Sequence, residues 1–178
     1  MDLKKHLLGR NLKWNWDAIS KYCIEQPSAI DELLDYCIDK KVVIQQNAGA
    51  VLGKIIDLDK EILIPHLFRI LQNLKNEPHD AVKRASMRIL QFIEIPEENL
   101  GDVFQLAINY LQSNKEPIAV KVFSMSSARK ICEKHPELCN ELIPIIEFLL
   151  EEKISRGIIA RAQKELKILH KLKKDPHS

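Results

Sequence analysis

Glycine is scarce in this chain of 178 residues, which contains only five. Tight β-hairpins need residues that tolerate a positive φ, and glycine is the main one. The shortage therefore disfavours an architecture of strands and short turns. A large stock of Leu, Ile, Lys and Glu instead favours helices, and the length suits one domain with a substantial core.

Long hydrophobic runs are missing as well, and none approaches the roughly 18 residues that a membrane-spanning helix needs. The segment Met1–His6 lacks the apolar core of a secretory signal. We therefore expect a soluble, cytoplasmic protein without a membrane partner. The four cysteines occur inside apolar helical patterns, where a free thiol behaves as a small hydrophobic group. A reducing compartment suits them; they are Cys23, Cys37, Cys132 and Cys139.

Recognisable catalytic and metal-binding motifs are also lacking. The six histidines are scattered, and those near predicted loops, His79 and His135, belong to no nucleophile or zinc motif. Cys132, His135 and Cys139 are close in the sequence, but a structural zinc usually takes four ligands and no second cysteine pair is present. No glycine-rich loop follows a predicted strand. We expect no enzymatic activity, no cofactor and no metal.

What the sequence does contain is a repeat, the signature of stacked-helix folds. Four apolar residues recur every 38 positions: Ile44, Val82, Val120 and Ile158. Four positions after each comes a small residue: Ala48, Ser86, Ser124 and Ala162. Further apolar or small residues follow at offsets of eight and eleven, which completes one stripe of a helix. The pattern predicts four equivalent helices that present a small residue where a neighbour approaches closely.

Between these helices lie others with apolar stripes of their own. We call these predicted helices the A segments, at about 27–39, 60–75, 98–113 and 137–152. The repeating ones are the B segments, at 40–58, 79–95, 117–135 and 155–174. Prolines at predicted helix starts, where a missing N–H does no harm, support the boundaries: Pro27, Pro96, Pro117 and Pro136. Residues 1–26 are expected to cover the open end of the stack, and 175–178 form a tail.

Two stretches resemble the HEAT repeat, a pair of antiparallel helices that stacks into an α-solenoid. Leu63-Ile64-Pro65, followed by Val82-Lys83, is similar to its helix A proline and its helix B start. Leu142-Ile143-Pro144 repeats the first part. The resemblance covers about residues 27–174. It implies a single all-α domain over 1–178 that acts as a non-catalytic scaffold, with the B helices lining a concave face.

A narrower likeness, at residues 119–125 and 158–166, is to small bacterial HEAT-like proteins without an assigned role. Some of those are labelled adenylosuccinate lyases, but that enzyme is much longer and its Ser- and Gly-rich catalytic loop has no counterpart here. HEAT-like folds also include DNA glycosylases, which hold bases against groove aromatics. The B segments contain no Trp. Trp14 and Trp16 fall in 1–26, where we expect them to pack in the core.

Charge divides between the two kinds of segment. The B segments carry 17 Lys and Arg against 5 Asp and Glu. The A segments, taken with their flanking residues as 27–39, 60–75, 96–113 and 136–152, carry 3 against 13. One surface should therefore be basic and the opposite one acidic.

The basic residues at offsets two, six and nine of the B segments point away from the core stripe. They are Arg84, Arg88, Arg129, Lys164 and Lys167. In the resembled fold these five side chains would share one groove. We expect them to be exposed, so that their substitution leaves the fold intact. Such a groove suits a protein partner, in particular an acidic one, or a nucleic-acid backbone; alternatively, the charges only keep the helices soluble.

Gly49 and Gly53 stand four apart in one predicted helix, where each costs about 1 kcal/mol relative to Ala. Either a ligand approaches the backbone there or a neighbouring helix packs tightly against it.

Overall fold

The computed structural model describes residues 1–9, 13–152 and 155–174. These residues divide into two compact units, an N-terminal unit of residues 1–94 and a C-terminal unit of 95–178. Every regular element within the described residues is a helix. No described helix combines the length and the apolar character needed to cross a membrane.

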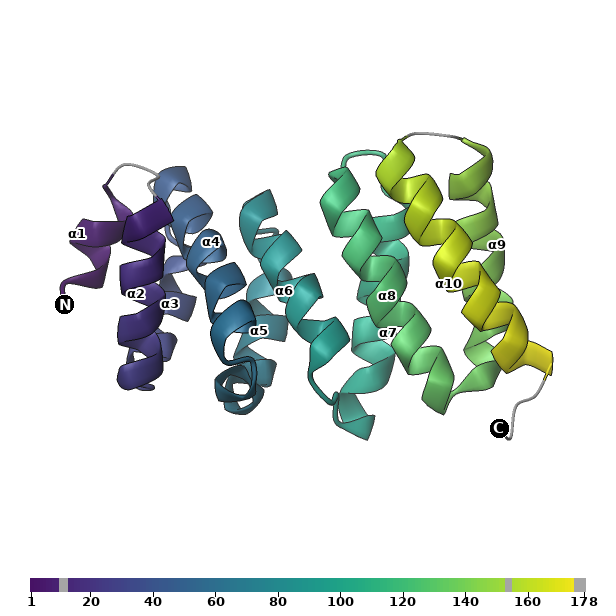
Figure 1. The fold of residues 1–178 in the computed structure, drawn as a ribbon, viewed down its shortest axis with the longest axis horizontal. Coiled ribbons are helices and arrows are strands. Elements are labelled where there is room, and N and C mark those ends of the chain that lie inside the picture. Colours follow the sequence, from purple (N-terminus) through teal and green to yellow (C-terminus); the bar gives the residue numbers. More distant parts are fainter. Residues whose placement is uncertain (10–12, 153–154, 175–178) are drawn as a thin grey trace. The chain divides into compact units, whose positions relative to one another are not determined.

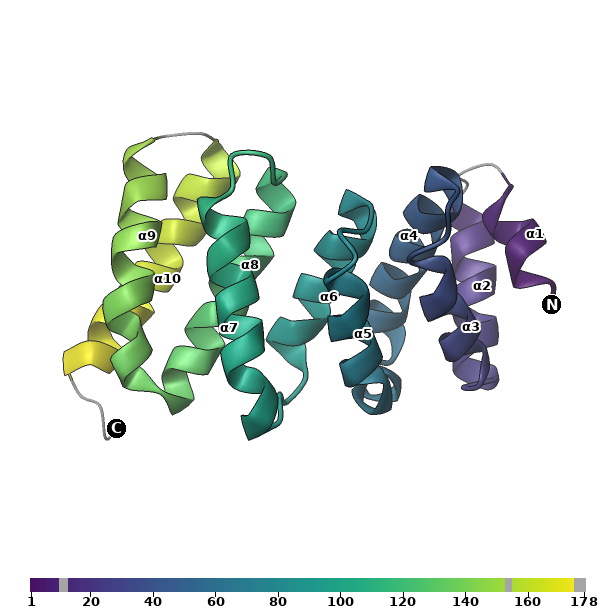
Figure 2. The same cartoon turned by 180° about the vertical axis from the view of Figure 1, so that it is seen from behind.

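The N-terminal unit contains three helix pairs. Its elements are α1 (Leu3–Leu7), α2 (Lys13–Glu25), α3 (Ala29–Tyr36), α4 (Val42–Leu58), η1 (Glu61–His66), α5 (Leu67–Leu74) and α6 (Asp80–Phe92). Within this unit, α2, α4 and α6 pack side by side in one layer, with α3 and α5 behind them (Figure 1). From the opposite side, α3 and α5 face the viewer (Figure 2).

The C-terminal unit contains two longer pairs. Its elements are α7 (Glu97–Gln112), α8 (Ile118–Lys134), η2 (Pro136–Leu138), α9 (Cys139–Glu151) and α10 (Arg156–Lys174). Helix α8 packs on α7 within its own pair and on α10 of the next pair, and α9 packs on α10. Thus α8 and α10 form one layer of this unit, and α7 and α9 form the other.

The repeat correctly predicted these helices and their core. The B segments correspond to α4, α6, α8 and α10, and all four small residues of the stripe are buried: Ala48, Ser86, Ser124 and Ala162. Each of these helices packs on a neighbouring helix of its own unit. A side chain no larger than serine lets the helices of adjacent pairs approach closely, which explains its recurrence at the same offset.

The second A segment differs from the predicted single helix over 60–75. It begins as the 3-10 helix η1, which contains Pro65, and becomes α-helical only at Leu67. Proline supplies no N–H for an i→i−4 hydrogen bond and its ring crowds the preceding turn. The apolar pattern continues from the 3-10 helix into the α-helix, so periodicity alone did not reveal the boundary between them.

Within the N-terminal region, α2 occupies the same layer as α4 and α6 and packs on α4. Trp16 on α2 donates its indole N–H to Asn47 Oδ1 on α4, at 2.8 Å. The Asn47 amide donates in turn to the Leu7 carbonyl at the end of α1, at 2.7 Å. The expectation that both tryptophans pack in the core is wrong for Trp14, which is 67% exposed.

Buried polar side chains join the end of one helix to the next. The Asn73 amide donates to the Leu34 carbonyl in the last turn of α3, at 2.7 Å. Lys121 Nζ donates to the Leu111 carbonyl in the last turn of α7, at 3.0 Å. The last carbonyls of a helix lack an i+4 amide partner, and these side chains supply a hydrogen bond to two of them.

Candidate functional site

The five basic residues predicted from the sequence occupy different surroundings. Arg84 and Arg88 belong to α6 of the N-terminal unit. The other three belong to the C-terminal unit, with Arg129 on α8 and both lysines on α10. Arg84, Lys164 and Lys167 are exposed, whereas Arg88 and Arg129 are partly buried.

Arg88 is held by its own unit. Its guanidinium forms an ion pair with Asp57 near the end of α4 and donates to the Gly53 carbonyl at 3.4 Å. It also lies over the ring of Phe92, 6.0 Å from the centroid, at the range of a cation–π contact. Much of its charge is therefore already compensated within α4 and α6.

Arg129 is more deeply enclosed, with a side chain only 18% exposed. Its Nε donates to Glu165 Oε2 on α10 at 2.9 Å, and its Nη1 contacts Glu133 one turn further along α8. The expectation that this arginine is freely exposed is therefore wrong, and we predict that its replacement destabilises the fold. The sequence pattern did not identify its partner Glu165, whose side chain is only 2% exposed.

The second oxygen of Glu165 completes a polar cluster between α8 and α10. The Ser126 hydroxyl donates to Glu165 Oε1 at 2.8 Å, and Arg161 lies 3.4 Å from the same oxygen. Arg161 also donates to Ser126 Oγ at 2.6 Å. A buried carboxylate persists when charged and hydrogen-bonded partners replace water. This cluster joins the two helices and leaves little of its charge for a ligand.

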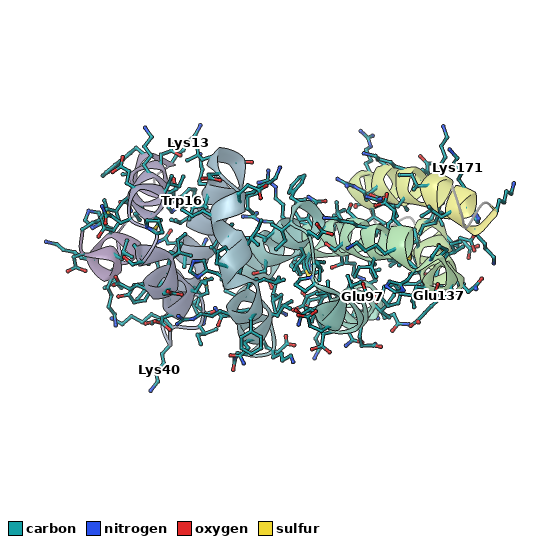
Figure 3. All side chains as sticks on the ribbon, turned by 90° about the horizontal axis from the view of Figure 1, so that it is seen from below. Lys13, Trp16, Lys40, Glu97, Glu137 and Lys171 are labelled. Carbon is teal, nitrogen blue, oxygen red and sulfur yellow. The ribbon has the colours of Figure 1, made fainter. Side chains whose placement is uncertain are left out.

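The exposed positive charge of the C-terminal unit is concentrated along α10. Five exposed residues lie on one side of this helix, which we call the lysine face: Arg156, Lys164, Lys167, Lys171 and Lys174. Among the described residues, none of the five has a carboxylate at ion-pair distance. Figure 3 shows Lys171 projecting outward from α10. The spacing of three or four residues from Lys164 onward could have identified the last two members from the sequence.

The opposite layer of this unit is acidic. Helix α7 contains Glu97, Glu98 and Asp102, and α9 contains Glu141, Glu147 and Glu151; neither helix contains a Lys or Arg. Figure 3 shows Glu97 and Glu137 on the other side of the unit from Lys171. The charge division inferred from the sequence is therefore present within the C-terminal unit.

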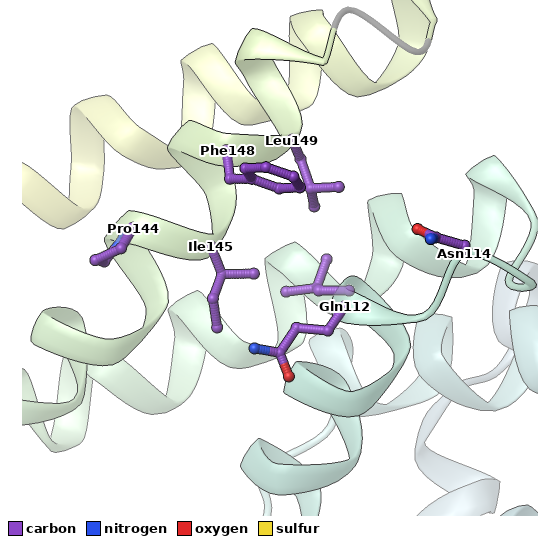
Figure 4. Close-up of a pocket in the computed structure, with 7 residues that line it drawn as sticks. Gln112, Asn114, Pro144, Ile145, Phe148 and Leu149 are labelled. Carbon is purple, nitrogen blue, oxygen red and sulfur yellow. The ribbon is translucent and has the colours of Figure 1, made fainter.

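A pocket opens in this acidic layer, between the end of α7 and the second half of α9 (Figure 4). It has a volume of 320 Å³. Its lining is mostly apolar: Leu111, Gln112, Asn114, Pro144, Ile145, Phe148 and Leu149. Phe148 is 60% exposed at its edge. No sequence motif indicated this site, because α9 reads as an ordinary amphipathic helix.

The two histidines that lie near predicted loops, His79 and His135, make contacts at helix ends. His79 caps α6, its Nδ1 accepting from the Ala81 N–H at 3.1 Å. His135 Nε2 lies 2.7 Å from Glu97 Oε1 at the start of α7. The first contact caps the start of α6, and the second joins the end of α8 to the start of α7.

The cysteines are free and buried. Burial raises the pKa of the Cys132 thiol, and also that of Cys139, so both are poorly reactive at neutral pH. Within residues 1–9, 13–152 and 155–174, no group of three His, Cys, Asp or Glu residues could hold a metal ion.

The model of the HEAT repeat domain family matches residues 3–171. No curated protein and no solved structure matches the chain. HEAT repeats generally mediate protein–protein interaction or scaffolding and are typically not enzymes. The match spans both units and nearly every helix described above, so the chain belongs to the HEAT repeat family.

Proposed function

We propose that this protein is a non-catalytic binding module that holds an acidic segment of another protein on the B-helix layer of its C-terminal unit, with the lysine face of α10 as the main contact. One observation carries the proposal: the five side chains of this face are exposed, and within the described residues no carboxylate pairs with them. Arg84 on α6 of the N-terminal unit is also exposed.

The length of α10 supports an extended ligand. Its 19 residues span about 28 Å at 1.5 Å per residue. From Lys164 onward a cation recurs roughly every 5 Å along it. An acidic polypeptide that follows the helix would meet several ammonium groups in succession. Because these groups are solvated, their main effects are on partner choice and association rate.

The test compares two triple variants with equal changes of charge. One is Lys164→Glu, Lys167→Glu and Lys171→Glu on the lysine face. Its control is Lys13→Glu, Lys21→Glu and Lys40→Glu, three exposed positions of the N-terminal unit. The probe is polyglutamate, titrated at low and moderate salt. We expect binding that weakens as salt rises, an affinity loss of about tenfold or more for the α10 variant, and little change for the control.

Two results would contradict the proposal. Equal weakening by both variants would attribute binding to net charge instead of α10. Tighter binding of arbitrary double-stranded DNA than of polyglutamate, with a steep salt dependence, would favour the alternative of a nucleic-acid backbone.

A further inference from the structure

We propose that the pocket between α7 and α9 is a second docking site, which takes a bulky apolar side chain from a basic segment of a partner protein. The pocket lies in the acidic layer of the C-terminal unit, whereas the lysine face lies in the other layer. The ligand of the pocket should therefore be basic. This proposal stands independently of the function proposed for α10.

The shape of the pocket argues for a side-chain anchor. Its 320 Å³ is at the lower end of the range for small-molecule sites. Ile145 extends toward Gln112 across the opening (Figure 4). The polar groups of the lining are the amides of Gln112 and Asn114, and no charged side chain lines it. Such a lining favours the burial of one or two apolar side chains, the usual centre of a protein-binding hot spot.

The surroundings of the pocket determine the charge of its occupant. Glu141 lies one helical turn before Ile145, and Glu151 and Glu152 follow Phe148 by about one turn. All three are exposed, and within the described part of the chain none has an ion-pair partner. Lys115, beside Asn114, contributes one positive charge nearby. Carboxylates therefore dominate the rim, and a segment with Lys or Arg on both sides of its anchor fits it.

The position of one exposed phenylalanine beside the pocket supports a partner on this face. Phe148 presents a largely uncovered ring beside an apolar hollow. A partner side chain in the hollow would cover the ring and shield both from water. An amphipathic helix with one apolar anchor and flanking cations is the simplest such partner.

The test uses a labelled peptide of alanine and lysine with one central leucine. One control peptide replaces the leucine by alanine, and another replaces every lysine by glutamate. The protein variant Phe148→Lys is paired with Phe68→Lys, which alters an equally exposed phenylalanine of α5 in the N-terminal unit. Circular dichroism establishes that both variants are folded, as expected for exposed positions.

We expect the leucine peptide to bind and to shift the Ile145 methyl signal in NMR spectra. Phe148→Lys, or loss of the leucine, should weaken binding by about tenfold or more. The glutamate peptide should not bind, and Phe68→Lys should have no effect. Equal binding of the alanine peptide would overturn the proposal, since charge alone would explain it. So would equal binding of the glutamate peptide, no binding of any peptide, or self-association through Phe148, which would make a second copy the occupant.

Discussion

Gly49 in α4 lies directly against the backbone of Ala81 at the start of α6. A Cβ at position 49 would be 2.5 Å from the Ala81 carbonyl carbon and 2.6 Å from the Val82 nitrogen. Side-chain carbons do not approach backbone atoms so closely, so only glycine fits. Of the two explanations that the sequence allowed for Gly49, tight helix packing is the one that the structure supports. A Cβ at Gly53 would instead point into open space, with no atom of another segment within 4 Å.

The two glycines therefore respond oppositely to alanine. Gly49→Ala should lower the free energy of unfolding by about 1–3 kcal/mol, because α4 and α6 must separate to admit the methyl group. Gly53→Ala should raise it by about 0.5–1 kcal/mol, the ordinary gain for alanine in a helix interior. Urea titrations of both variants measure the difference. A stabilised Gly49→Ala protein would contradict the close approach of the two helices.

The buried small residues of the repeat predict a similar sensitivity. Ala48→Leu should cost about 1–3 kcal/mol through overpacking, since Ala48 is fully buried. Ala160→Leu on the exposed side of α10 is the matched control and should change stability by less than about 0.5 kcal/mol. Thermal melts compare the two. An unchanged melting temperature for Ala48→Leu would count against the close helix contact at this offset.

Replacement by Glu should lower the free energy of unfolding much more at the enclosed Arg129 than at the exposed Arg84. Arg129→Glu places a carboxylate beside the buried Glu165 and should cost about 3 kcal/mol or more. Arg84→Glu reverses the same charge in solvent and should alter stability by less than about 0.5 kcal/mol. Denaturant titration distinguishes them. Equal small effects would mean that the cluster around Glu165 contributes little.

Lys121 gives stability a specific pH dependence. Burial lowers its pKa below the ordinary 10.5, while the nearby Glu116 acts in the opposite direction. Between the folded and unfolded pKa values, the unfolded chain binds more protons than the folded one, so this lysine makes stability rise with pH. The free energy of unfolding should therefore increase more from pH 7 to about pH 10 in the wild type than in Lys121→Met. Identical slopes would show that Lys121 titrates normally.

The helices were predictable because their repeat is strict. Apolar residues at fixed offsets in a 38-residue period specify the buried face of each helix and the alternation of A and B helices along the chain. Two departures escaped this reasoning. Pro65 changes the type of helix without breaking the apolar pattern, and Trp14 is exposed although it is aromatic.

The candidate site was only partly predictable, because exposure depends on partners far away in the sequence. Asp57 and Glu165 lie 31 and 36 residues from the arginines that they contact. Offsets within one helix show which positions point away from the core stripe. They do not show which of those positions meet a partner from another helix. A clue was present in α10, where Glu165 is the single acidic residue among seven Lys and Arg. An isolated acid in a basic helix is a reasonable candidate for a buried ion pair.

The hydrogen bond from Trp16 to Asn47 has a practical consequence for spectroscopy. The chain contains two tryptophans, and both belong to α2 of the N-terminal unit. Intrinsic fluorescence therefore reports on residues 1–94, through an indole that loses its amide partner on unfolding, while far-ultraviolet circular dichroism reports on the helices of both units. Coincident curves from the two signals would show one cooperative transition, whereas separated curves would show that the two units unfold in turn.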